Sequence, residues 1–242
     1  MTLLRSLLFN VTFYAWTLLL GVVALPMVAA PRRSVMGFGR WWSGSVLWLA
    51  RVIAGIDYEF RGSHNLRRGA VIIAMKHQSA WDTLAAPVLI DDPAIVVKRE
   101  LLWIPFYGWY ARRAGMIAID RGAGATALKS MVLRARGVVA QGRPIVIFPE
   151  GTRTAVGARR DYQPGVAALY AQLGLPVVPV AVTSGLCWPR RSFLKRPGRI
   201  LVEALPAVPP GLDRRQFLSD LQSRIESATE RLRVEAETAK RR

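Results

Sequence analysis

The amino-terminal segment carries a hydrophobic pattern unlike that of the rest of the chain. Residues 6–31, which number 26, contain no charged side chain, and arginines stand on both sides of them at Arg5 and Arg32. As a helix this stretch would be about 39 Å long, enough to cross a hydrocarbon core of about 30 Å. The pattern predicts a helix that spans the bilayer or only enters it. A cleaved signal peptide is the alternative, although the apolar run is longer than a usual signal sequence requires.

A second apolar segment follows at residues 41–50, again between two arginines. Ten residues are too few to span a bilayer, but they can lie in its interface. The segment contains Trp41, Trp42 and Trp48, whose amphipathic rings favour the level of the lipid headgroups. A buried core helix filled with aromatic side chains is the alternative. We expect residues 1–54 to form a two-helix module that associates with a membrane.

From residue 55 onward the pattern changes to short β-branched runs separated by helical stretches. Continuous apolar runs are typical of strands buried on both faces, and they occur at residues 71–75, 94–97, 116–119, 145–148 and 177–182, with residues 199–204 as a further candidate strand. Helical spacing is found at residues 83–90, 104–114, 125–141, 166–173 and 213–237. The alternation predicts that residues 55–242 form an α/β domain, with a mixed, mostly parallel sheet flanked by helices.

Composition narrows the function classes. The chain has 34 Lys+Arg against 16 Asp+Glu, a net charge of +18, and yet 52% of its residues are hydrophobic. The apolar content excludes a disordered tail, and a single cysteine, Cys187, excludes a disulfide framework or a multi-cysteine zinc site. A basic and apolar chain is typical of a protein on an anionic membrane. A membrane-anchored nucleic-acid binder is disfavoured because many of the tryptophans lie in the apolar segments, whereas base stacking needs aromatics among the basic residues.

The first candidate for chemistry is a histidine with an aspartate five residues later. His77 stands just after the predicted strand 71–75, and Asp82 lies at the start of the next predicted helix. On one continuous helix, five residues turn by about 500°, which would point the two side chains apart. With His77 in the turn they can meet, and a carboxylate on one imidazole nitrogen leaves the other free as a base. Taken alone, the spacing also fits a capping aspartate beside a surface histidine.

Cationic clusters follow three more of the predicted strands. Lys98 opens the run Lys-Arg-Glu-Leu, Arg121 closes Ile-Asp-Arg, and Arg153 closes Phe-Pro-Glu-Gly-Thr-Arg. A glycine after a strand lets backbone N–H groups approach an anion, and arginine offers a planar fork for phosphate. Each cluster alone is consistent with a solvated loop. Because ligands of open α/β sheets bind at the carboxyl ends of the strands, their coincidence indicates an anion-binding site there.

The order of these motifs resembles the glycerolipid acyltransferase family, and within it the bacterial lysophosphatidate acyltransferases. The resemblance covers residues 56–205 and rests on His-x4-Asp, Lys-x-Glu-Leu-x3-Pro-x2-Gly, Ile-Asp-Arg, Phe-Pro-Glu-Gly-Thr-Arg and Val-Pro-Val, in this order. It implies transfer of a fatty acyl group to the sn-2 hydroxyl of 1-acyl-sn-glycerol-3-phosphate, which gives phosphatidic acid. Two departures are Lys76, where the family often has asparagine, and residues 183–185, which lack the asparagine usual after the fourth motif.

The same resemblance implies roles for individual residues. His77 would be the general base and Asp82 the acid that orients it. Lys98 and Arg153 would hold the acceptor phosphate with Arg121 nearby, and the Phe-Pro-Glu-Gly-Thr-Arg motif would position the glycerol. The implied substrate-binding set is Lys98, Arg121, Glu150, Gly151, Thr152 and Arg153. No acyl-enzyme is needed, so we expect Cys187 to be inert and Ser79 to be a helix cap.

The expected partners are acyl-CoA or acyl carrier protein, lysophosphatidic acid and anionic membrane lipid, with no nucleic acid, metal or cofactor. We expect the protein at the bacterial inner membrane, with its active site on the cytoplasmic side. One alternative keeps the fold and changes the acceptor to glycerol 3-phosphate, a lyso-ornithine lipid or another lysophospholipid. Another is a membrane scaffold without catalysis, which would have no use for His77 and Asp82 together.

Overall fold

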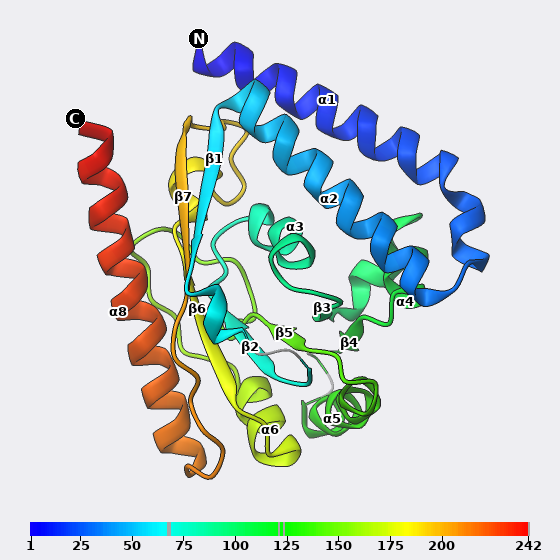
Figure 1. The fold of residues 1–242 in the computed structure, drawn as a ribbon, viewed down its shortest axis with the longest axis vertical. Helices are drawn as coiled ribbons and strands as arrows, with labels where there is room; N and C mark the ends of the chain where they lie inside the picture. The colour runs from blue at the N-terminus through cyan, green and yellow to red at the C-terminus, as the bar shows by residue number, and fades with distance from the viewer. Residues whose placement is uncertain (67–68, 121, 123, 242) are drawn as a thin grey trace.

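The computed structural model describes residues 1–66, 69–120, 122 and 124–241. A twisted sheet forms the middle of the molecule, with helices on both faces (Figure 1). Helices α1, α2 and α3 cover one face, and α5, α6 and α8 cover the other. This layered arrangement confirms the predicted α/β class.

The sheet contains seven strands in the described part of the chain, in the order β1-β7-β6-β2-β5-β3-β4. Every neighbouring pair is parallel except β6 with β7, which is antiparallel, so the sheet is mixed and mostly parallel as predicted. The central strands β2, β5 and β6 are buried along their whole length, as their unbroken apolar sequences require. The strands are β1 Ile56–Arg61, β2 Ile72–Met75, β3 Ala94–Lys98, β4 Ile117–Ile119, β5 Ile145–Ile147, β6 Val177–Val182 and β7 Gly198–Ala204.

The described helices divide the hydrophobic core into two main clusters, one on each face of the sheet. Phe9, Trp81 and Val180 belong to the cluster on the α1–α3 side, and Met131 and Phe217 to the cluster on the α5–α8 side. Shorter 3-10 segments lie at residues 25–29, 63–65 and 99–103. The α-helices are α1 Thr2–Val23, α2 Arg32–Ala54, α3 Ala80–Leu89, α4 Tyr107–Arg113, α5 Gly124–Ala140, α6 Pro164–Leu173, α7 Ser184–Cys187 and α8 Arg214–Arg241.

The amino-terminal helices differ in extent from the sequence prediction. α1 has 22 residues, begins at Thr2 and ends at Val23, so it includes Arg5 and stops before the end of the uncharged run. A 3-10 segment with Pro26 at its start follows, because proline lacks the N–H that a continuing helix would use. The short segment 41–50 is part of the longer helix α2. The boundary at residue 54 coincides with the end of α2, and the assignment of a separate module there stays a prediction.

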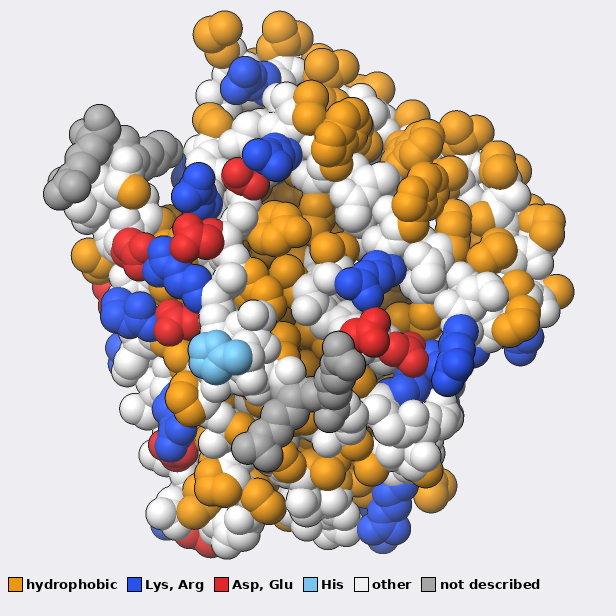
Figure 2. All heavy atoms as spheres, viewed as in Figure 1, with side chains coloured by type: hydrophobic (Ala, Val, Ile, Leu, Met, Phe, Trp, Pro, Cys, Tyr) orange, Lys and Arg blue, Asp and Glu red, His pale blue; other side chains and the backbone are white. Residues whose placement is uncertain are grey.

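α1 and α2 pack against each other and leave an uncovered apolar face. α1 buries Ser6, Phe9 and Gly21, and the Trp16 indole donates to the Ser45 hydroxyl of α2 at 2.9 Å. Figure 2 shows hydrophobic side chains gathered over this end of the molecule. By length and composition, α1 is the one described helix that could cross a membrane. We call the following exposed side chains the apolar face: Leu3, Leu4, Leu7, Leu8, Val11, Tyr14, Leu18, Leu19, Val22 and Val23 of α1, with Trp41, Trp48 and Val52 of α2.

Candidate active site

The motif residues gather at one edge of the sheet. Strands β2, β5, β3 and β4 are neighbours in this order and run parallel, so their carboxyl ends lie side by side. His77 follows β2, Glu150 follows β5, Lys98 ends β3 and Asp120 follows β4. The sheet topology thus places the four motifs next to one another, as the strand-end pattern predicts.

His77 and Asp82 form the predicted pair. The Nδ1 atom of His77 lies 2.9 Å from Oδ2 of Asp82, whose side chain is fully buried. A carboxylate oxygen accepts hydrogen bonds, so Nδ1 carries the proton and Nε2 is the nitrogen with a free lone pair. The imidazole also stacks on the Phe148 ring with centroids 4.1 Å apart. Two sides of the imidazole are therefore held, and the arrangement suits a general base.

The same aspartate caps helix α3. Ser79 is the N-cap and accepts from the N–H of Trp81 at 3.1 Å, while Asp82 Oδ2 accepts from the N–H groups of Ser79 and Gln78 at 2.8 and 2.7 Å. This reciprocal capping box confirms that Ser79 is a cap. Capping and pairing with histidine are not alternatives here, because one carboxylate oxygen does both. The backbone of α3 thereby fixes the carboxylate that orients His77.

Glu150 lies behind His77 in a buried position. Its Oε1 accepts from the backbone N–H of His77 at 3.2 Å and from the Thr154 hydroxyl at 3.1 Å. The Lys76 ammonium lies 3.2 Å from the same oxygen. Burial raises the pKa of Glu150, and the charge of Lys76 opposes this rise. All these contacts are with protein, so the implied contact of Glu150 with glycerol stays a prediction, and the structure gives the residue a supporting position under His77.

Lys76 connects this site to the carboxy-terminal helix. Its side chain is only 1% exposed, and its Nζ donates to Oε1 of Glu226 on α8 at 2.6 Å. The Tyr162 hydroxyl donates to the same oxygen at 3.1 Å. Burial, with the nearby carboxylates, raises the pKa of Tyr162, so the phenol keeps the proton that it donates. Sequence reasoning missed Lys76 as a site residue, together with Thr154, Tyr162 and Glu226; the only signal was a lysine directly after a buried strand.

The other predicted binding residues that the structure describes make no hydrogen bond or ion pair with His77 or Asp82. Lys98 is 47% exposed in its side chain and pairs with Glu100 at 2.9 Å. Arg153 is half-buried and makes no hydrogen bond or ion pair to any described residue. Gly151 has a φ of 69°, a left-handed conformation that favours glycine, and its N–H donates to Phe148 at 3.0 Å. Thr152 is half-buried in the same turn, and Arg121 lies outside the described residues.

The departure at residues 183–185 has a structural counterpart. The N–H of Gly185 donates to Oε1 of the buried Gln78 at 3.0 Å. A Cβ atom at this glycine would lie 2.7 Å from Cγ2 of Val156, so only glycine fits without a shift. Helix α7 is thereby attached to the turn that carries His77. Cys187 at the end of α7 is 4% exposed and packs in the core, a position that does not suit a nucleophile.

Within the described part of the chain, no three His, Cys, Asp or Glu side chains are grouped so that they could hold a metal ion. The strand ends carry the cations Lys98 and Arg153 together with the carboxylates Glu150 and Asp120, and the cations suit an anionic substrate. The site thus combines an imidazole base with nearby cations. Such a combination can deprotonate an alcohol that carries a phosphate.

Comparisons with known proteins agree with this chemistry. The family model described as Acyltransferase matches residues 57–183. The 1-acyl-sn-glycerol-3-phosphate acyltransferase of Pseudomonas aeruginosa is 36% identical over 228 residues, which cover 93% of this chain and 87% of that protein. The protein of the same name from Limnanthes alba is 32% identical, covering 82% of this chain and 69% of that one.

A solved structure supports the fold. The crystal structure of the 1-acyl-sn-glycerophosphate (LPA) acyltransferase PlsC from Thermotoga maritima superposes with a TM-score of 0.80 at 20% identity, covering 96% of this chain and 98% of that one. The family model spans the strands that carry His77, Lys98 and Glu150, where the site geometry has just been described. The chain belongs to the acyltransferase family.

Proposed function

We propose that this protein is a 1-acyl-sn-glycerol-3-phosphate acyltransferase that makes phosphatidic acid for phospholipid biosynthesis. The observation that carries the proposal is the His77–Asp82 pair, joined at 2.9 Å beside cationic strand ends, in a chain that is 36% identical to an enzyme of this name. In the reaction the sn-2 oxygen of lysophosphatidate forms an ester bond with the acyl carbon of a thioester. The carbon–sulfur bond breaks, and the thiol leaves with the proton of the hydroxyl.

His77 moves that proton. Its Nε2 takes the proton from the sn-2 hydroxyl as the oxygen attacks, and Asp82 stabilises the imidazolium through Nδ1. The imidazolium then protonates the departing thiolate, so the base is regenerated without an acyl-enzyme. General base catalysis of this kind contributes about 10²–10⁴-fold to the rate.

Arg153 is proposed to bind the acceptor phosphate together with Lys98. Its guanidinium follows β5 in the half-buried turn of Gly151 and has no partner among the described side chains. We expect Arg153→Ala to raise the KM for lysophosphatidate by roughly 10–100-fold, since a hydrogen bond to a charged group is worth about 1.5–3 kcal/mol. Steady-state kinetics with varied acceptor measures this.

Arg136→Ala is the matched control, because Arg136 is an exposed arginine of α5 outside the four motifs. Its KM for lysophosphatidate should stay at the wild-type value. An unchanged KM for lysophosphatidate in Arg153→Ala would show that Arg153 does not bind the acceptor phosphate.

The membrane is proposed to be the place of reaction. A sixteen-carbon chain carries roughly 12 kcal/mol of hydrophobic free energy at about 0.8 kcal/mol per CH₂, so extracting acceptor and product into water would be costly. The apolar face of α1 and α2 offers a surface that can enter the lipid, and the net charge of +18 attracts anionic headgroups. We propose the bacterial inner membrane, with the site on the cytoplasmic side where acyl thioesters are present.

Charges placed on the apolar face should release the protein from lipid. The triple variant Leu4→Glu/Leu8→Glu/Val11→Glu changes three exposed residues on one side of α1. We expect its binding to vesicles with anionic lipid to fall at least about tenfold, since each apolar side chain contributes about 1.5–3 kcal/mol when buried. Co-sedimentation measures the bound fraction. Leu133→Glu, at a leucine that is 70% exposed on α5, is the control and should bind like the wild type.

The proposed activity is tested with purified protein in detergent micelles. Lysophosphatidate is supplied with acyl-CoA or acyl carrier protein, thiol release is followed, and the lipid product is identified. We expect phosphatidic acid. Parallel assays with glycerol 3-phosphate, a lyso-ornithine lipid and other lysophospholipids test the acceptor. Faster transfer to one of these than to lysophosphatidate would keep the acyltransferase chemistry and change the substrate.

A further inference from the structure

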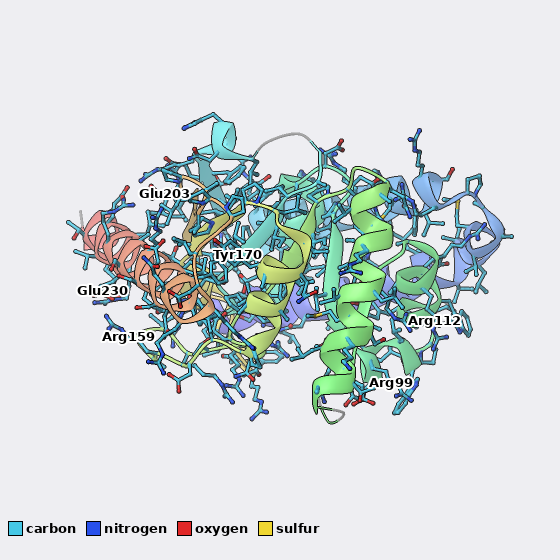
Figure 3. The ribbon with its side chains drawn as sticks, turned by 90° about the horizontal axis from the view of Figure 1, so that it is seen from below. Arg99, Arg112, Arg159, Tyr170, Glu203 and Glu230 are labelled. Atoms are coloured by element: carbon cyan, nitrogen blue, oxygen red, sulfur yellow. The ribbon has the colours of Figure 1, made fainter. Side chains whose placement is uncertain are left out.

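A concave site lies at the edge of the sheet formed by β4, and His77 is not among the residues that line it. It is a cavity of about 430 Å³ between the 3-10 segment 99–103, α4 and α5. Figure 3 shows Arg99 and Arg112 on the α4–α5 side of the molecule, at the opposite end from Arg159 and Glu230. The volume falls within the range of about 300–1,000 Å³ that is usual for small-molecule sites. Among the acceptor residues assigned above, those that the structure describes do not line it.

The cavity is strongly cationic. Arg99, Arg112 and Arg134 line it, and Asp120 is the one acidic side chain among the lining residues, so three positive charges face one negative charge and two remain. Arg99 is occupied, because its Nη1 lies 2.8 Å from Oδ2 of Asp120. The side chains of Arg112 and Arg134 make no hydrogen bond or ion pair to any residue that the structure describes. Two forked donors are therefore directed to the same hollow and left available for an anion.

An aromatic ring completes the site. The Trp103 side chain lines the cavity and is 66% exposed, which is unusual for so large an apolar surface outside a contact. Indole rings stack on nucleic-acid bases, and this stacking contributes about 1–3 kcal/mol per base. Arginines that can bind phosphate, beside an indole on which a base can stack, suit a nucleotide better than a phospholipid headgroup.

The position of the cavity fits the length of an acyl donor. His77 follows β2 and Asp120 follows β4, which lie three strand positions apart in the order β2-β5-β3-β4. At about 4.8 Å per strand, the separation across the sheet is about 14 Å. The pantetheine arm of coenzyme A has about thirteen bonds from its sulfur to its first phosphorus, or about 15 Å at the advance per bond of an extended chain. A thioester at His77 would thus place its phosphates at the cavity.

We propose that this cavity binds the phosphorylated nucleotide of acyl-coenzyme A. The proposal rests on the acyltransferase function proposed above and names its donor. Arg112 and Arg134 bind the diphosphate or the ribose phosphate, and Trp103 stacks on the adenine. An acyl carrier protein would bring one phosphodiester and no base, so it would leave the indole and most of the cavity unused. Lys98 and Arg153, the two described cations proposed to hold the acceptor phosphate, are not among the lining residues of this cavity.

The test compares acyl-coenzyme A with acyl-pantetheine 4′-phosphate, which carries the same thioester and arm without the nucleotide. For the wild type we expect a higher kcat/KM with acyl-coenzyme A. In Arg112→Ala/Arg134→Ala the ratio of the two kcat/KM values should fall at least about tenfold, through KM, because charge-assisted hydrogen bonds are lost. Arg136→Ala is the control. It removes an exposed arginine of α5, the helix that carries Arg134, and Arg136 does not line the cavity, so this variant should keep the wild-type ratio.

Calorimetric binding of free coenzyme A gives a readout that needs no turnover. The wild type should bind it more weakly as salt rises, and the double variant at least about tenfold more weakly than the wild type. The proposal would be overturned if the double variant and Arg136→Ala showed the same ratio of kcat/KM between acyl-coenzyme A and acyl-pantetheine 4′-phosphate. It would also be overturned by a wild type that uses acyl carrier protein and binds no free coenzyme A. Coenzyme A binding without transfer from any donor would instead count against the proposed function and leave the nucleotide site standing.

Discussion

His77→Ala should lower kcat by about 10²–10⁴-fold, the usual contribution of a positioned general base. The substitution removes Nε2, the nitrogen that remains free while Nδ1 is bound to Asp82 at 2.9 Å. The KM for lysophosphatidate should change little, because the proposed phosphate ligands Lys98 and Arg153 do not contact the imidazole. Thiol release at saturating substrates measures the effect, and vesicle binding should equal that of the wild type.

His64→Ala is the matched control for this experiment. His64 is the only other histidine of the chain and lies exposed in the 3-10 segment 63–65. Its kcat should be that of the wild type. A folded His77→Ala protein with more than about a tenth of the wild-type kcat would show that the imidazole is not the base, since that loss falls below the range for base catalysis.

The sequence predicts a strand well where every residue of that strand is buried. Strands between two helix layers are apolar at every position, so β2, β5 and β6 stand out as continuous runs. β1 was missed because its sequence Ile-Asp-Tyr-Glu-Phe-Arg alternates, as suits a strand at the edge of the sheet. The prediction of one helix over residues 104–114 was wrong at its start. α4 begins only at Tyr107, after Pro105 and a left-handed Phe106 with φ of 62°.

The candidate site was accessible only in part, for a topological reason. His77 and Glu150 follow strands and Asp82 lies in the first turn of α3, so their approach can be inferred from the rule that parallel strands end at one edge. Lys76 and Glu226 are 150 residues apart, and their contact depends on how α8 crosses the sheet. Arg112 and Arg134 lie within helices, where an exposed arginine carries no sequence signal of its own. The motifs thus indicated the proposed reacting groups, and only the packed structure showed which side chains contact them.

Lys76→Met should be the most damaging change outside the reacting pair. It leaves the carboxylates of Glu150 and Glu226 buried without the ammonium that lies 3.2 and 2.6 Å from them. Breaking a buried ion pair by removing one partner costs about 3–5 kcal/mol, so the free energy of unfolding should fall by this order. Denaturant titration in detergent measures it.

The same variant should also change catalysis through Glu150. The ammonium lowers the pKa of this carboxyl against the effect of burial, so its removal lets the pKa rise and Glu150 is protonated at higher pH. A neutral carboxyl is a weaker acceptor for the His77 N–H, so the turn that carries the base loosens on the acid side. We expect the acid limb of the kcat–pH profile to move to higher pH and kcat to fall at least about tenfold, the equivalent of about 1.4 kcal/mol in the barrier.

The double variant Lys76→Met/Glu226→Gln separates charge balance from positioning. The glutamine keeps an acceptor for the Tyr162 hydroxyl and removes one of the two unpaired charges, so part of the lost stability should return. Glu150 still lacks its cation, so kcat should stay low and the acid limb should stay displaced. If the double variant instead regains the wild-type kcat and pH profile, Lys76 serves only to neutralise Glu226. If only stability returns, the ammonium is a positioning group that opposes the protonation of Glu150 beneath His77.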